Sequence, residues 1–384
     1  MEPQIALIEH FSTLKDPRTA WLVRHQLIDI ITIAICAGIC GADYWTDIEE
    51  FGKVNEDWFQ TFLKLPNGIP SHDTFGDVFA ALSPDEFENC FRSWTISICE
   101  FFKGDIIPID GKVLRRSHDT SDSKSAIQIV SAWSCANRLV LGQVKVDEKS
   151  NEITAVPELL QSLALEGCIV TLDALHCQKK TAKTIIEQGA DYVITLKANQ
   201  GKLYDAVDEF FKDTLVNEPE NEVVDFYMTD EHSHGRQETR RYWVTEQLDW
   251  LEQKEQWEGL QSVGLVERER IIGEEKSYET HIYISSLEGD AEDFALAVRS
   301  HWEVENSLHW VLDIAFREDE SRIRKKHGAE NMSILRKIAL NLLRQEKTLK
   351  RGIKAKRLKA GWDRRYLLKV LNSLGNATES LGKE

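Results

Sequence analysis

Apolar residues recur every three or four positions through the first hundred residues of the chain, as they do on one face of a helix. Four stretches show this spacing most clearly, at 26–39, 44–51, 58–63 and 84–101. We therefore predict an all-helical N-terminal domain over residues 1–102. Within it, Ser71 or Asp73 would cap a helix, which we favour over a catalytic role for His72 and Asp73.

Short apolar runs of the kind found in strands replace the helical spacing after residue 105. The five runs lie at 106–109, 126–134, 139–146, 168–172 and 192–196. Helical patterns at 154–165 and 178–188 separate the last three runs. The order β-β-β-α-β-α-β predicts an α/β mixed sheet with right-handed crossovers over residues 103–200. No glycine-rich dinucleotide motif or phosphate loop accompanies it.

The pattern changes again near residue 201, where an acidic stretch (205–230) comes before segments of alternating polarity. Those segments, at 239–244, 264–272 and 279–285, predict a β-rich insertion over residues 201–286. Helical spacing returns at about residue 290. We expect residues 287–374 to complete the core with helices and residues 375–384 to form a polar tail.

Composition adds few restrictions to this picture. With 384 residues, 42% of them hydrophobic, the chain can bury a substantial core. The longest apolar stretch, residues 27–42, contains Asp29 and is shorter than the roughly 20 residues of a membrane-spanning helix. The first residues lack the pattern of a signal peptide. The seven cysteines are scattered, so we expect reduced thiols and a cytoplasmic protein without a membrane partner.

The net charge of −17 argues against a nucleic-acid partner until its distribution is considered. Residues 321–370 carry a net charge of +14, so the remainder of the chain is strongly acidic. This block is either a solvated helical face or a surface for phosphates. The basic residues in it that we consider for DNA contact are Arg322, Arg324, Lys325, Lys326, Arg336, Lys337, Lys354, Lys356, Arg357 and Lys359.

A weaker group of basic residues lies in the predicted insertion and comprises His234, Arg236, Arg240 and Arg241. The simpler interpretation, which we favour, is an ordinary strand face. DNA contact is the alternative.

Two aspartates occupy equivalent positions, because Asp110 and Asp173 each come directly after an apolar strand. If the first and fourth strands are parallel neighbours, about 4.8 Å apart, both carboxylates lie at the same edge of the sheet. Such a pair is half of a site for Mg²⁺ or Mn²⁺, since adjacent carboxylates need a cation or a proton between them. For either aspartate alone we would favour a cap at the end of its strand, and it is the repetition of the pattern that favours a metal site.

A third carboxylate is expected from the segment 299–313. On a helix Trp302, Glu305, His309 and Leu312 share one face, which would place Glu305 among apolar and aromatic neighbours. An ionised glutamate is costly there unless it is paired or binds metal. An ion pair with Arg299 or with a neighbouring helix is the alternative, and we expect Glu303 to point to solvent.

These motifs together resemble the H-repeat-associated family of bacterial insertion-sequence transposases, over nearly the full chain. That family belongs to the Asp-Asp-Glu class with a ribonuclease-H-like core. The clearest matches are Ile-Asp-Gly-Lys (109–112), Asp-Ala-Leu-His-Cys-Gln-Lys (173–179) and His-Trp-Glu-Val-Glu-Asn-Ser-Leu-His-Trp (301–310). Further matches lie at 41–52, 68–75, 146–155, 196–200 and 233–236.

The resemblance implies that Asp110, Asp173 and Glu305 are a catalytic triad that binds two Mg²⁺ or Mn²⁺ ions. It also implies a ribonuclease-H-like mixed sheet with a β-rich insertion, flanked by the helical N-terminal domain and a basic helical C-terminal region. The expected partners are double-stranded DNA, as terminal inverted repeats and target, and a second copy of the chain in a homodimer on DNA.

Related transposases carry Tyr, Arg and Lys where this chain has Val298, His301 and Leu312. The DNA contacts of that Arg and Lys therefore do not carry over directly, and we consider Arg299, His301 and Asn306 as substitutes. Two other functions stay open: a metal-dependent nuclease that does not transfer strands, and a non-catalytic DNA-binding remnant of an insertion element.

Overall fold

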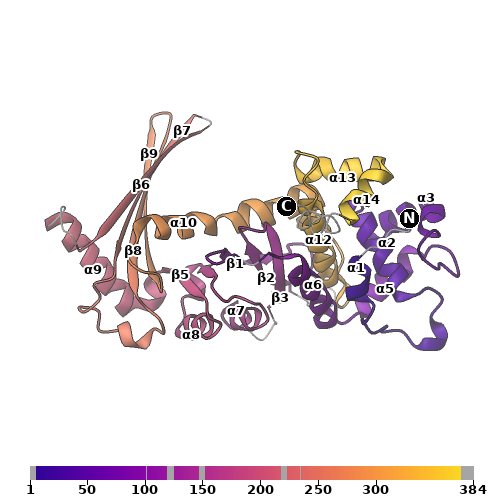
Figure 1. Cartoon of the computed structure of the whole chain (residues 1–384), viewed down its shortest axis with the longest axis horizontal. Coiled ribbons are helices and arrows are strands. Elements are labelled where there is room, and N and C mark those ends of the chain that lie inside the picture. The colour runs from indigo at the N-terminus through magenta and orange to yellow at the C-terminus, as the bar shows by residue number, and fades with distance from the viewer. Residues whose placement is uncertain are drawn as a thin grey trace, which may run out of the picture.

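The computed structural model describes residues 6–100, 102–118, 125–146, 152–217, 223–233 and 235–372. Within these residues the chain forms a mixed sheet of nine strands in the order β3-β2-β1-β4-β5-β9-β8-β7-β6, with a helical lobe at one end (Figure 1). The strands are β1 (Ile106–Val113), β2 (Gln128–Ser134), β3 (Leu139–Lys145), β4 (Ile169–Leu172), β5 (Asp191–Leu196), β6 (Asp225–Ser233), β7 (Arg236–Thr245), β8 (Ser262–Ile272) and β9 (Glu275–Ser285).

The middle of the sheet agrees with the prediction except at Asp110. β1 is antiparallel to β2 and parallel to β4, with Ile109 paired with Leu172, and β4 is parallel to β5. The five predicted strands and the parallel contact between the first and fourth are therefore confirmed. The predicted end of the first strand, at residue 109, is wrong, because pairing with β2 continues β1 past Asp110 to Val113.

The segment after β5 differs from the predicted β-rich insertion in two ways. It begins with a helix, α9 (Gly201–Asn217), in which Leu203, Val207 and Phe211 recur at helical spacing and are buried. Its last strand, β9, then pairs with β5, so that β6–β9 extend the same sheet. Acidic residues of the other side of the helix lie between these apolar residues in the sequence, so the helical spacing is easily overlooked.

Helices cover the two faces of the sheet. On one face, α10 (Ala291–His301) packs Phe294 against strand residues such as Val193 and Val266. A Cβ on Gly264 would lie 2.4 Å from the Phe294 ring, so glycine is what lets α10 approach β8. On the opposite face lie α7 (Glu152–Gln161), α8 (Lys179–Glu187) and α9.

The helical lobe joins the two ends of the chain. Its helices are α1 (Ala6–Phe11), α2 (Leu27–Ile39), α3 (Trp45–Val54), α4 (Glu56–Phe59), α5 (His72–Ala81), α6 (Pro84–Ile98), α11 (Trp310–Phe316), α12 (Gly328–Gln345), α13 (Ile353–Trp362) and α14 (Arg364–Leu371). Ile33 of α2, Phe79 of α5 and Ile338 of α12 belong to one core. The predicted N-terminal domain is thus helical, but it shares its core with the C-terminal helices. Ser71 caps α5 as predicted, because its Oγ accepts a hydrogen bond from the Thr74 amide.

The lobe also covers the edge strand β3 with side chains that replace a neighbouring strand. Buried Asn341 of α12 accepts a hydrogen bond from the Val140 amide and donates one to the Val140 carbonyl, both at 2.9 Å. Glu88 of α6 accepts one from the Gln143 amide at 2.8 Å. The edge that would otherwise pair with another chain is therefore closed.

All seven cysteines lie in the described part of the chain and are free thiols. None of the helices in that part is long and apolar enough to cross a membrane.

Candidate metal centre and its cleft

Asp110 and Asp173 are neighbours because of the register between β1 and β4. Asp110 follows Ile109, and Asp173 follows its partner Leu172. Both side chains line one cavity of about 420 Å³ on the face of the sheet that α10 covers. The structure therefore brings the two aspartates together in one cavity, as predicted.

Asp173 is also a cap, which was the alternative interpretation of this residue. It caps the short 3-10 helix η2 (Ala174–His176), and its Oδ1 accepts a hydrogen bond from the Leu175 amide at 3.1 Å. The side chain is still 49% exposed, so one carboxylate oxygen stays accessible to the cavity. The cap fixes the direction of the carboxylate without burying it.

Glu305 lies in a π-helical segment, η5 (Val304–His309), between α10 and α11. The wider π turn breaks the predicted α-helical face: Trp302 and Glu305 are exposed, whereas His309 and Leu312 are buried. The prediction that Glu305 lies among apolar neighbours is therefore wrong. Segments of this kind occur often at functional sites, and here it directs Glu305 into the cavity.

Glu303 does not point freely to solvent as expected. It is half-buried beside the Cys135 thiol, whose pKa is raised by burial and further by the charge of Glu303. Its position is that of a packed acid of the lobe rather than a solvated one.

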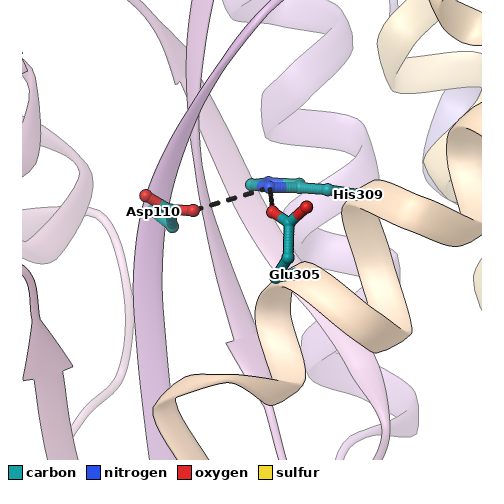
Figure 2. Close-up of side chains that lie close together, drawn as sticks. All are labelled: Asp110, Glu305 and His309. Carbon is teal, nitrogen blue, oxygen red and sulfur yellow. Dashed lines mark hydrogen bonds and ion pairs between the residues drawn. The ribbon is translucent and has the colours of Figure 1, made fainter. Parts of the chain in front are cut away.

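Asp110 and Glu305, which line the cavity, form a compact group with buried His309 (Figure 2). His309 Nδ1 lies 3.2 Å from Glu305 Oε2 and 3.5 Å from Asp110 Oδ2. One ligand atom from each of the three residues lies within 4.8 Å of the others. The hydrogen bond with His309 lowers the pKa of Glu305, so the carboxylate is held in its ionised form.

This donor set fits a divalent cation. Carboxylate oxygens suit Mg²⁺ and Mn²⁺, and an imidazole nitrogen adds a ligand that favours transition metals. Two carboxylates so close together also need a cation or a proton between them. Asp173 lines the same cavity without belonging to the compact group.

Two residues that the sequence analysis missed stand behind the aspartates. Glu152 begins α7 directly against Gly111, where a Cβ would collide with its carboxylate. His176 Nε2 lies 3.6 Å from Glu152 Oε2 and 3.7 Å from Asp173 Oδ1. Burial raises the pKa of Glu152, and the charges of Asp173 and Asp110 raise it further. The glycine directly after Asp110 and the histidine in the motif 173–179 were the available signals.

Lys112 connects β1 to the segment that carries Glu305. Its Nζ contacts Asp313 of α11 and lies 3.3 Å from Glu318 Oε2 and 3.8 Å from Asp319 Oδ1. Burial lowers the pKa of Lys112, but the charges of Glu318 and Asp313 outweigh it, so the net change is upward. The ammonium is thus a charged link two residues from Asp110.

The predicted DNA-contact residues near Glu305 divide between the cavity and the surface. Arg299 and His301 line the cavity, where Arg299 Nη2 lies 2.8 Å from Glu231 Oε1 and His301 Nδ1 lies 3.0 Å from Thr171 Oγ1. Burial lowers the pKa of His301, which favours the neutral ring. Asn306 is exposed and donates a hydrogen bond to the Trp302 carbonyl.

A second cavity, of about 560 Å³, holds three of the four predicted basic residues after α11. Arg322, Arg324 and Lys325 line it together with Trp45 and other residues of α3 and α5. Lys325 pairs with Asp77 at 2.6 Å. Lys326, the next residue in the sequence, is exposed and does not line this cavity.

The prediction of DNA contact is wrong for four members of the basic block. Arg336, Lys337, Lys356 and Arg357 are buried, each no more than 6% exposed. Arg357, for example, donates to the Gly38 carbonyl at 3.0 Å and pairs with Asp43. These cations hold the helical lobe together and cannot reach a DNA surface. His234 lies outside the described residues.

The fold and this site define a mixed α/β protein with an acidic, metal-compatible centre beside two parallel strands. The family model described as the transposase DDE domain matches residues 101–342, and the model of the associated N-terminal region matches residues 8–95. The chain therefore belongs to the DDE transposase family and is a DNA transposase.

Two relatives from Escherichia coli agree with this assignment. The chain is 44% identical over 374 residues to the "H repeat-associated putative transposase YhhI" of Escherichia coli (strain K12), which covers 96% of this chain and 98% of that protein. It is 42% identical over 383 residues to the "Putative transposase YncI" of Escherichia coli O157:H7, covering 98% and 97%. Among solved structures, a piggyBac transposase synaptic complex with hairpin DNA aligns over 100% of this chain and 82% of that chain, with 11% identity and a TM-score of 0.47.

Proposed function

We propose that this transposase cuts DNA at the ends of a bacterial insertion sequence and joins the freed ends to target DNA, with Asp110, Asp173 and Glu305 as its catalytic triad. One observation carries the proposal: Asp110 and Glu305, far apart in the sequence, have ligand atoms within 4.8 Å of one another in a cavity that Asp173 also lines.

We also propose that β1–β5 form a ribonuclease-H-like core. The support is their order, β3-β2-β1-β4-β5, in which three antiparallel strands are followed by two parallel ones. In such an arrangement, the ends of the parallel strands present side chains to a ligand at one edge. β6–β9 and α9 would then be an insertion between the second and third acids.

Asp110, Asp173 and Glu305 would hold two divalent cations. When bound, such ions activate a hydroxyl nucleophile and neutralise charge on the phosphate that is cut. The chain positions these ligands: the Leu175 amide orients Asp173, and His309 orients Glu305 and keeps it ionised. Water would first hydrolyse the phosphodiester at the end of the insertion sequence and leave a free 3′-hydroxyl. That hydroxyl would then attack a phosphodiester of the target in the same site, so the proposed mechanism requires no covalent protein nucleophile.

The proposed partners follow from this reaction. We assign phosphate contacts to the exposed or half-buried residues Arg322, Arg324, Lys325 and Lys326, and contacts near the cut to Arg299, His301 and Asn306. Two ends of the insertion sequence must be joined, so we propose a homodimer on DNA. The place of action would be the bacterial cytoplasm, where the chromosome lies.

The test is cleavage and joining of the DNA that flanks the gene, with and without Mg²⁺ or Mn²⁺. Replacing Glu305 by Gln keeps the size of the side chain but removes its charge, so the cleavage rate should fall by roughly two to three orders of magnitude. Glu292→Gln, an exposed acid at the start of α10, is the control and should cut at the normal rate.

Near-normal cutting by the Glu305 variant would contradict the assignment of the third ligand. If the unaltered protein cuts the DNA but never joins it to the target, the result would favour a nuclease. If it cuts no DNA with or without metal, the result would favour a non-catalytic remnant.

A further inference from the structure

The cavity with the triad has a second, basic end. Its lining residues extend from Asp110 of β1, past α10, to residues of β9, β8 and β7. Five basic side chains line this part, and we call them the cationic wall: Lys197, Arg240, Arg268, His281 and Arg299. They come from four strands or strand ends and one helix, so no sequence motif unites them.

The wall brings like charges together. Arg240 of β7 and Arg268 of β8 are direct partners in the antiparallel register, and Arg299 of α10 shares the carboxylate of Glu231 with Arg240. Like charges directly opposite each other on a sheet are destabilising. Burial lowers the pKa of Arg240, and the nearby charges of Arg299 and Arg268 lower it further. Such a cluster persists only where anions compensate it.

Glutamates provide part of this compensation. Glu238 is buried against Arg240, whereas Glu231 and Glu279 are 44% and 49% exposed. Glu279 Oε2 lies 2.6 Å from Arg268 and 3.5 Å from His281. Lys197, exposed at the end of β5, has no ion pair among the described residues. Within the part of the chain that the structure describes, the wall therefore has one exposed cation without an ion pair, and two of its glutamate partners are accessible to solvent.

The same strands provide a comparison on their other face. Arg241, next to Arg240 on β7, lies 2.6 Å from Glu267 Oε1 and 3.2 Å from Glu269 Oε2. It pairs with two carboxylates where Arg268 pairs with Glu279, and it does not line the cavity. Arg241 thus separates the effect of an arginine in an ion-pair network from the effect of an arginine in the cavity.

We propose that the cationic wall binds the phosphodiester backbone of the DNA strand that enters the triad, several nucleotides from the phosphate that is cut. The proposal rests on the proposed function. Strands lie about 4.8 Å apart, so β8 is roughly 19 Å from β1, and DNA rises about 3.4 Å per nucleotide. The strand residues of the wall, from Lys197 at the end of β5 to Arg240 on β7, would therefore contact phosphates about three to seven nucleotides from the cut, beyond those that Arg299 contacts near the cut. It attracts a polyanion that the three carboxylates alone would repel.

The test is the salt dependence of DNA binding in an Asp110→Asn background with Mg²⁺, using a fluorescein-labelled duplex that spans one end of the insertion sequence. Each lost phosphate contact lowers the steepness of log Kd against log salt by about 0.9. The double variant Lys197→Ala/Arg268→Ala should thus lose about 1.8 of the slope between roughly 50 and 200 mM salt. The matched variant Arg241→Ala should keep the full slope.

If the double variant and Arg241→Ala have the same slope, and thermal unfolding shows that both are folded, the proposal is wrong. The basic residues of the cavity would then form ion pairs without binding DNA. The single variant Arg268→Lys, which keeps the charge at this position and leaves Lys197 intact, should keep most of the slope. Failure of the proposed function gives a different result, because the duplex would then be cut despite Asp110→Asn or would not be bound by any variant.

Discussion

At the scale of single residues, His309 determines how the site can work. It is buried, and its Nδ1 lies within 3.5 Å of carboxylate oxygens on both Asp110 and Glu305. Its Nε2 is buried without a hydrogen-bond partner among the described residues. The ring is therefore held by packing and not by a second polar contact, with one nitrogen directed at the two proposed metal ligands.

Replacement of His309 by Phe should weaken Mn²⁺ binding by about 10- to 100-fold, because it removes the nitrogen but keeps a buried ring. The loss should be larger for Mn²⁺ than for Mg²⁺, since imidazole suits transition metals. The affinity for each metal can be measured by titration of tryptophan fluorescence, because Trp302 and Trp310 flank η5. His72→Phe, at an exposed site, is the control. Equal metal affinity in both variants would show that His309 is only a packing residue.

At the scale of elements, the site depends on how β1 is joined to η5 and α11. Lys112 on β1 contacts Asp313 of α11 and Glu318 of η6 (Glu318–Glu320), on either side of the short connection that follows α11. Glu318 is buried and its pKa is lowered: burial raises it, but the charges of Lys112, Lys337 and Arg336 prevail. The link holds the strand of Asp110 against the segment of Glu305.

Lys112→Met should lower the free energy of unfolding by about 3 to 5 kcal/mol, because it leaves buried Glu318 with less compensation. The loss should shrink as the pH falls, since a carboxylate with a lowered pKa contributes stability above its unfolded pKa and loses it on protonation. Urea unfolding at neutral and acidic pH measures both effects. Lys350→Met, at an exposed position, should change stability by less than about 0.5 kcal/mol. A variant as stable as the control would contradict the structural importance of the link.

At the scale of the whole molecule, the helical lobe unites the first and last parts of the chain. Helices α2, α3 and α5 and helices α11–α14 bury one core, and α12 also closes the edge of β3. The cavity lined by Arg322 and Trp45 lies at the contact between these two parts. The catalytic core therefore depends on residues from both ends of the chain.

A chain that begins at residue 101 should aggregate or unfold at a much lower temperature, because it exposes the apolar surface of α12. Adding residues 1–100 as a separate polypeptide should restore a soluble complex that elutes as one species in gel filtration. Circular dichroism melting of each piece and of the mixture provides the measurement. A stable, monomeric fragment 101–384 would show that the lobe is two domains in contact, as the sequence suggested.

Local patterns in the sequence predicted the five core strands, the helical N-terminal region and the parallel placement of Asp110 and Asp173. These features depend on the period of apolar residues and on chain order, which neighbouring residues determine. The triad itself stays a prediction. Its members lie in one cavity, and the resemblance to a known family had already identified them.

Only the tertiary structure decided which side each residue faces and what it meets. Register placed Arg240 in the cavity and Arg241 outside it, and a π turn exposed Glu305 while burying His309. Packing removed Arg336, Lys337, Lys356 and Arg357 from the surface. The physical reason is that partners distant along the chain determine these outcomes, whereas sequence patterns report local spacing.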